Sequence, residues 1–282
     1  SKVIFASDTG TAATKGTLAA ARYAHGATGN QSFGYFGARR TDGATAITKV
    51  DRIDYSNDTS TASPKGNLTA GRSYLGATGN GSFGYFGGGM PAPSSTPMSS
   101  IDRVDYSNDT ATASSKGPLN SAELRTTATG NQNFGYWGGA GSAPSTYSSE
   151  VQRLQYATDT LTASPKGPLT DARGNLGSMG AQANANPVVQ IISAPVVPIA
   201  NNGYWAAGNT NNSPYRYSLV ERIDFSNDTA TATPRGNLYA VRYNGGGTGN
   251  TFFGYHGGGR NSGTSPSAIS AMDRVEYAND LD

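Results

Sequence analysis

The chain has 282 residues and a formal net charge of +2, and only 14% of its residues are charged. This near-neutral balance argues against nucleic acid or an anionic membrane as a partner, and the absence of cysteine excludes disulfide bonds and thiolate metal sites. No run of 18 apolar residues is present, so we expect no membrane insertion. Abundant Gly, Ser, Thr and Asn, with short aromatic and β-branched runs, favour an all-β chain with many tight turns.

A repeated phrase organises the whole sequence. Residues Ile101 to Thr110 read IDRVDYSNDT, and related phrases recur at a spacing of about 50 residues. The tyrosine position of the phrase is held by Phe5, Tyr55, Tyr106, Tyr156, Phe225 and Tyr277. Arrays of this kind bury the apolar face of each unit against its neighbours. We therefore expect a single domain over residues 1–282, with repeats at about 5–54, 55–105, 106–155, 156–224 and 225–282.

The first complete unit predicts four short strands. Tyr23 to Thr28 and Ser32 to Phe36 form a hairpin around the turn Gly29-Asn30. Ile47 to Tyr55 alternates between two faces as a third strand, and Thr59 to Ser63 supplies a fourth. Four antiparallel strands are the unit of a β-propeller blade.

The number of blades follows from the second strand of each unit. Its Gly-Tyr-x core occurs at Gly34-Tyr35-Phe36, Gly84-Tyr85-Phe86, Gly135-Tyr136-Trp137, Gly203-Tyr204-Trp205 and Gly254-Tyr255-His256. The chain ends after a third strand, Met272 to Tyr277, and begins with a lone fourth strand, Thr9 to Ala13. Pairing of these two segments would leave no free edge. The sequence thus predicts an all-β, five-bladed propeller of four-stranded antiparallel blades, closed by the N-terminal strand.

Two sets of basic residues recur in every unit. One lies in the third strand, at Arg52, Arg103, Arg153, Arg222 and Arg274. The other precedes a glycine, at Lys15, Lys65, Lys116, Lys166 and Arg235. Either set could form an anion-binding ring, but residues present in every blade are more typical of links between blades or of solvated loops.

Catalytic and metal-binding patterns are scarce in this sequence. Only His25 and His256 are available, no Ser-His-Asp or zinc spacing occurs, and the Asn-Asp turns lack the alternating ligands of a calcium loop. Paired carboxylates on adjacent blades, as in a sialidase-like site, remain an open alternative. We expect no enzyme activity, no cofactor and no metal.

The loops between the second and third strands differ most between units. They cover residues 38–46, 89–100, 140–149, 207–218 and 259–270. Because antiparallel strands alternate in direction, all five should emerge on one face. The ligand-binding candidates on this face are Arg39, Arg40, Tyr215, Arg216, Tyr217, Arg260 and Asn261. Such mixtures suit shallow polar recognition, including that of sugars, although loops of this composition often bind nothing.

The fourth unit contains an insert at residues 174–202. Its apolar stretch either supplies the first strand of that blade or docks on another protein. The partner-docking candidates are Val188, Val189, Ile191, Ile192, Val196 and Val197.

The repeat resembles known propeller families. The strand ends Gly84-Tyr85-Phe86-Gly87-Gly88 and Gly135-Tyr136-Trp137-Gly138-Gly139 are similar to the Tyr-x-x-Gly-Gly of kelch repeats, although the kelch tryptophan of the outer strand is replaced by Thr-Ala-Thr or Ser-Thr-Ala runs. The phrases Tyr-Ser-Asn-Asp-Thr and Phe-Gly-Tyr-Phe-Gly-Gly also resemble repeats in tail-associated and structural proteins of marine bacteriophages. This resemblance implies a non-enzymatic virion component, in a tail or fibre, that contacts the host surface or other virion proteins. The alternative is a secreted lectin with repeated sugar sites, so we expect a virion or extracellular location and possible glycan partners.

Overall fold

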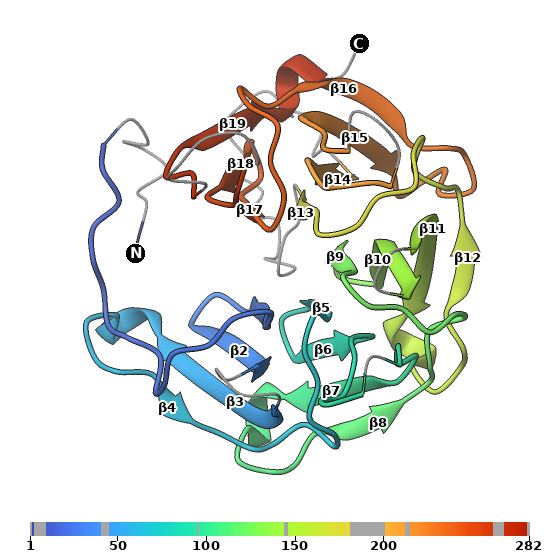
Figure 1. The fold of residues 1–282 in the computed structure, drawn as a ribbon. Helices are drawn as coiled ribbons and strands as arrows, with labels where there is room; N and C mark the ends of the chain where they lie inside the picture. Colours follow the sequence, from blue (N-terminus) through green and yellow to red (C-terminus); the bar gives the residue numbers. More distant parts are fainter. Residues whose placement is uncertain are drawn as a thin grey trace, which may run out of the picture.

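The computed structural model describes residues 2, 10–40, 45–94, 96–143, 146–180, 201–211, 215–261 and 268–280. Five antiparallel sheets are arranged around a central channel, each with its first strand innermost (Figure 1). The predicted all-β, five-bladed propeller is therefore confirmed. We number the sheets as blades 1 to 5 in chain order.

The strands of the five blades have the following bounds. Blade 1 contains β1 (Gly26–Gly29), β2 (Phe33–Arg40), β3 (Ala46–Asp54) and β4 (Ser63–Pro64). Blade 2 contains β5 (Gly76–Gly79), β6 (Phe83–Gly87), β7 (Ile101–Asp105) and β8 (Ser114–Lys116). Blade 3 contains β9 (Thr127–Gly130), β10 (Phe134–Ala143), β11 (Thr146–Gln155) and β12 (Ser164–Lys166). Blade 4 contains β13 (Gly177–Gly180), β14 (Asn202–Ala206), β15 (Leu219–Asp224) and β16 (Thr233–Asn237), and blade 5 contains β17 (Gly246–Gly249), β18 (Phe253–Gly257) and β19 (Met272–Glu276). Short 3-10 turns follow the third strand of four blades, at Tyr55–Asn57, Tyr106–Asn108, Tyr156–Thr158 and Tyr277–Asp280.

The first and fourth strands differ from their predicted bounds. β1 begins at Gly26 rather than Tyr23, because Ala24 has a positive φ of 55° that interrupts the extended backbone. β4 begins only at Ser63, because Asp54 caps the 3-10 turn after β3 and the chain needs several residues to return to the sheet. In blade 4, β13 is formed by Gly177–Gly180, so the prediction that the apolar stretch of the insert supplies the first strand was wrong.

The predicted closing pair was also wrong. The two backbone bonds of Ala13 go to Lys2, at 2.8 and 2.9 Å, and not to β19. Within the described residues, β19 pairs with β18 alone, while Thr9 lies outside them. The N-terminal segment instead attaches to blade 1, where Lys15 lies 3.0 Å from Asp58 and the amide of Ala62 donates to the carbonyl of Thr17.

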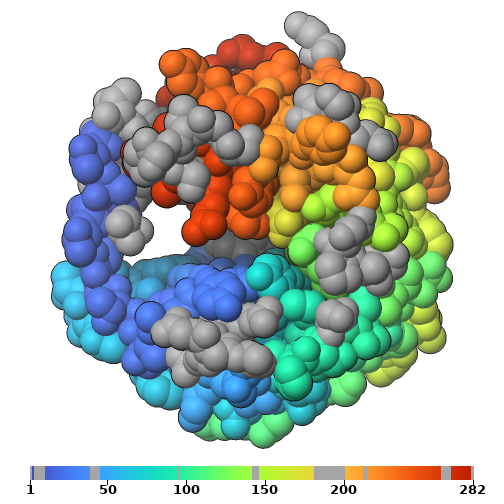
Figure 2. Space-filling view, in the orientation of Figure 1, coloured from blue at the N-terminus to red at the C-terminus, as the bar shows by residue number. Residues whose placement is uncertain are grey.

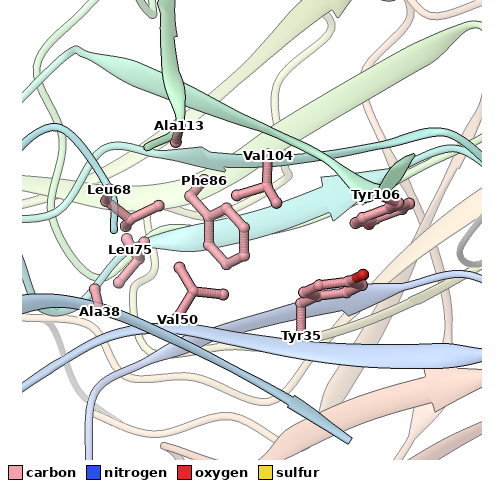
Figure 3. Close-up of a cluster of buried hydrophobic side chains, with 9 residues drawn as sticks. All are labelled: Tyr35, Ala38, Val50, Leu68, Leu75, Phe86, Val104, Tyr106 and Ala113. Atoms are coloured by element: carbon pink, nitrogen blue, oxygen red, sulfur yellow. The ribbon is translucent and has the colours of Figure 1, made fainter. Parts of the chain in front are cut away.

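The hydrophobic core lies between neighbouring blades. Figure 3 shows the cluster between blades 1 and 2, where the rings of Tyr35 and Tyr106 stack with centroids 4.6 Å apart and Phe86 is fully buried. A Cβ atom on Gly37 would lie 2.5 Å from the Phe86 ring, so glycine is required at this close approach. Burying an aromatic side chain of this size contributes about 2 to 3 kcal/mol. Trp137 and Trp205 take the same place at the next two boundaries.

The recurring basic residues link each blade to the next one. Asp109 of blade 2 accepts hydrogen bonds from the Tyr35 hydroxyl at 2.9 Å and from Arg52 at 2.7 Å, and it lies 3.3 Å from Lys65. Asp159, Asp228 and Asp280 receive the corresponding basic pair at the following boundaries. The arginines that share these carboxylates therefore act as the links between blades that we expected. The lysines, which we expected in solvated loops, share the same carboxylates.

Candidate binding face at the mouth of the central channel

The innermost strands of the five blades line a channel with a volume of about 1090 Å³. Its wall is rich in glycine and threonine and also includes apolar side chains, such as Phe36, Leu75 and Leu176. The side chains that vary between blades are concentrated where the chain enters each first strand. That end of the channel is also the end at which the loops between second and third strands emerge, because the second strand runs antiparallel to the first.

A belt of left-handed residues surrounds this mouth. One residue per blade precedes the first strand with φ between 55° and 62°, namely Ala24, Tyr74, Arg125, Asn175 and Asn244. The amide of Tyr74 donates to the carbonyl of Ala24 at 2.8 Å, and Arg125, Asn175 and Asn244 each donate in the same way to the preceding member, at 2.8, 3.1 and 2.9 Å. All five residues line the channel.

The five belt residues share one backbone conformation but differ in their side chains. Left-handed geometry is costly for residues other than glycine and is most easily adopted by Asn. The belt nevertheless presents Tyr, Arg and two Asn side chains, so the rim of the channel is chemically asymmetric. Sequence reasoning missed these residues; the available signal was their constant place, two positions after the repeated residue that is Arg in four units and Glu in one.

The structure brings two of the predicted ligand-binding residues together. Arg260 pairs through its backbone with Tyr243 and lines the channel, while the guanidinium of Arg216 lies over the Tyr243 ring, 5.2 Å from its centroid. Tyr215 directly precedes Arg216 in the chain, is 57% exposed and has a φ of 59°. These four residues form what we call the blade 4–5 rim.

The other predicted binding residues are placed differently. Tyr217 is half-buried beneath Arg173, whose guanidinium lies 5.3 Å from the ring centroid, so it serves packing. Arg39 and Arg40 belong to β2 of blade 1, and their side chains lie outside the described part. Asn261 follows Arg260 and is half-buried. The docking candidates Val188, Val189, Ile191, Ile192, Val196 and Val197 also fall outside the described ranges.

A polar network continues the rim towards blade 3. The Asn175 amide donates to Oδ1 of Asn209 at 3.0 Å, and the Asn209 amide donates to the Tyr147 hydroxyl at 2.6 Å. These groups hold the loops of blades 3 and 4 against the belt. Amides and phenol edges next to an aromatic ring are suitable partners for hydroxyl-rich ligands.

Blade 3 departs from the buried ion pairs of the other blades. Arg22, Arg72, Arg173 and Arg242 each pair with an acidic residue of their own blade. At the same two positions blade 3 carries Glu123 and Gln152, both almost completely buried. Burial, reinforced by the charge of Glu150, raises the pKa of Glu123 to about 8, against the opposing hydrogen bonds of Ser121 and Gln152. The Glu123 carboxyl is therefore largely protonated at neutral pH.

This raised pKa predicts a specific pH dependence of stability. Between the ordinary Glu pKa of 4.5 and about 8, the unfolded chain loses the Glu123 proton while the folded protein keeps it. The contribution of Glu123 to the free energy of unfolding is thus fully present below pH 4.5. It falls by several kcal/mol as the pH rises through 8. The variant Glu123→Gln should abolish most of this loss, and Glu150→Gln should reduce it, as measured by urea unfolding between pH 4 and 9. A Glu123→Gln profile as steep as that of the wild type would contradict the assignment.

His256 is fully buried, whereas His25 is half-buried and lines the channel. His256 takes the place of Phe86 in blade 5, and burial lowers its pKa to about 4, with a further contribution from Arg242. Burial and Arg22 also lower the pKa of His25. Both imidazoles are therefore neutral at pH 7, and His256 packs against Gly177 and Gly245.

Among the described residues, no group of three His, Asp or Glu side chains is placed to hold a metal ion. None of the helices in the described ranges is long and apolar enough to cross a membrane. Comparison with protein-family models and with curated proteins finds no match for this chain.

Proposed function

We propose that the protein is a non-enzymatic binding and scaffolding propeller that recognises its partner with the face around the channel mouth. The observation that carries this proposal is that repeated and unrepeated residues have different roles in the structure. The repeated charged residues hold the scaffold, either by linking adjacent blades, as at Asp109, or by pairing within a blade, as at Arg72, whereas the unrepeated side chains gather at one end of the channel. A scaffold needs the first set, and specific recognition needs the second.

The proposed setting is a virion. The kelch-like strand ends and the Tyr-Ser-Asn-Asp-Thr phrase support a tail or fibre component that contacts the host surface or other virion proteins. Cell-surface glycans would be natural targets, because the rim offers an exposed tyrosine, arginines and amides without a deep apolar pocket.

A secreted lectin is the second candidate. It is favoured by the blade 4–5 rim, where Arg216 and Tyr243 stack beside Arg260 and the exposed Tyr215. The rim is built from residues that differ between blades, so this candidate predicts one principal sugar site and not five equivalent ones.

A matched pair of variants tests the binding face. Tyr215→Ala combined with Arg216→Ala should weaken binding to a glycan array or to host cells by about tenfold or more, since Trp, Tyr and Arg dominate binding energy at interfaces. The stability of this variant should fall by no more than about 1 kcal/mol, because Tyr215 is exposed and Arg216 loses one half-buried contact with the Tyr243 ring. Binding is measured by surface plasmon resonance, with thermal melts as the check on folding.

The control is Phe252→Ala. Phe252 is 58% exposed, almost the same as Tyr215, but it lies in the turn between β17 and β18 at the other end of the blade. It should leave binding unchanged. An equal loss of binding in both variants, or tight binding by Tyr215→Ala with Arg216→Ala, would refute the assignment of the face.

A further inference from the structure

The boundary between blade 5 and blade 1 is built unlike the other four. The belt of left-handed residues is bonded from Ala24 through Asn244, but in the described ranges no backbone bond joins Asn244 back to Ala24. Figure 2 shows an opening through the molecule at this place, between the N-terminal segment and the last blade. We call this boundary the open seam and define it by Phe36 and Tyr55 of blade 1 and Thr248, Gly257 and Met272 of blade 5.

The blade 5 side of the open seam is more exposed than the same side of the other blades. Met272 is 38% exposed, whereas its equivalents Val50, Ile101, Val151 and Val220 are at most 3% exposed because the next blade covers them. Thr248 is exposed, while Thr28, Thr78 and Thr129 are buried against the following blade. Among the described residues, a Cβ atom on Gly257 would meet only Met272 of its own blade, whereas at Gly37 and Gly87 it would meet Phe86 and Trp137 of the next blade.

The blade 1 side shows the complementary exposure. Tyr55 is 45% exposed, while its equivalents Tyr106, Tyr156, Phe225 and Tyr277 are at most 9% exposed. The difference arises because each of those rings stacks on a tyrosine of the preceding blade, as Tyr106 does on Tyr35. Phe36 is half-buried, although Phe86, Trp137 and Trp205 at the same position are fully buried.

At the outer rim of the open seam, the N-terminal segment is paired like the third and fourth strands of a blade. The pair Lys2 and Ala13 reproduces the pair Arg103 and Ser114 that joins the third and fourth strands of blade 2. Lys2 and Lys15 both lie 3.0 Å from Asp58, just as Arg52 and Lys65 converge on Asp109. The N-terminal segment therefore holds the outermost position of a blade next to blade 1, and the described residues provide no first or second strand inside it.

We propose that the open seam is a docking site for one additional blade with the sequence chemistry of this repeat. The occupant would place its second-strand aromatic residue on Gly257, stack its preceding tyrosine on the blade that follows and bond its left-handed residue to both Asn244 and Ala24. Its third strand would extend to the Lys2 and Ala13 pair. Addition of strands to a free sheet edge is an established mode of recognition. Here the exposed residues of the open seam also define where the side chains of the added blade would pack.

An extended variant tests this inference directly. A copy of residues 72–102, which contain β5, β6 and the first two residues of β7, is fused before Lys2 of the full chain, so that the repeat continues in phase. The control extension carries the same copy with Tyr85→Ala and Phe86→Ala in the copied segment only. The readouts are the melting temperature and the hydrogen exchange of the Ala24 amide.

We expect the intact copy to raise the melting temperature by about 5 °C or more relative to the control extension. The Ala24 amide should exchange at least about tenfold more slowly, because it gains a backbone acceptor. Equal melting and equal exchange in both extended variants would overturn the proposal. A wild-type chain that sediments as a dimer with a protected Ala24 amide would also overturn it, since a second copy would then be the occupant.

Discussion

Replacing Arg72 with glutamate should destabilise the protein by at least about 3 to 5 kcal/mol, the usual cost of breaking a buried ion pair. The Arg72 guanidinium is fully buried and donates to Asp102 at 3.0 Å and to the carbonyl of Ser100 at 2.7 Å. The substitution removes these bonds and places a second carboxyl beside Asp102. Unfolding in urea at pH 5 gives the free energy directly.

The chain itself supplies the matched control for this prediction. Blade 3 carries Glu123 and Gln152 where blade 2 carries Arg72 and Asp102. The double variant Arg72→Glu with Asp102→Gln should therefore recover a large part of the lost stability at pH 5, where the introduced carboxyl is protonated. A double variant as unstable as Arg72→Glu alone would show that the exchange in blade 3 depends on other residues.

Replacing Asp159 with alanine should cost about 3 kcal/mol, because one carboxylate holds three groups of the preceding blade. It accepts from the Tyr85 hydroxyl at 2.9 Å and from Arg103 at 2.7 Å, and it lies 3.4 Å from Lys116. The loss leaves Arg103 and Lys116 without their shared anion at the boundary between blades 2 and 3. Thermal and urea unfolding measure the effect.

The control for the Asp159 prediction is Asp105→Ala. Asp105 caps the 3-10 turn at Tyr106–Asn108 by accepting from the Ser107 amide at 2.9 Å, and in the described part of the chain its hydrogen bonds stay within its own blade. Its removal should cost only about 1 kcal/mol. Equal losses in the two variants would contradict the role assigned to Asp159 as an inter-blade link.

The repeat made the blades predictable from sequence, because its glycines and aromatic residues mark positions that pack against a neighbour. Gly37 and Phe86 illustrate this: the first has no room for a side chain and the second fills that room. The closing contact was not predictable in the same way. The phrase around Phe5 equally allows the N-terminal segment to complete blade 5 or to begin another blade, and only the backbone bonds of Ala13 distinguish the two.

The candidate site was predicted in part. Composition identified the loops that contain Tyr215, Arg216 and Arg260, since these residues break an otherwise regular pattern. The belt residues Arg125 and Asn175 were missed, because their role depends on a left-handed backbone that no local motif predicts. Glu123 was visible in the sequence as a glutamate where the other units carry arginine. Its raised pKa depends on burial, which only the fold shows.

Cryo-electron microscopy of the protein in the assembly from which it is isolated tests the central claim most directly. The account predicts that the partner, whether protein or glycan, contacts the face at the channel mouth, with density against Tyr215, Arg216 and Arg260. A partner bound at the opposite end of the blades, with this rim facing solvent, would contradict it.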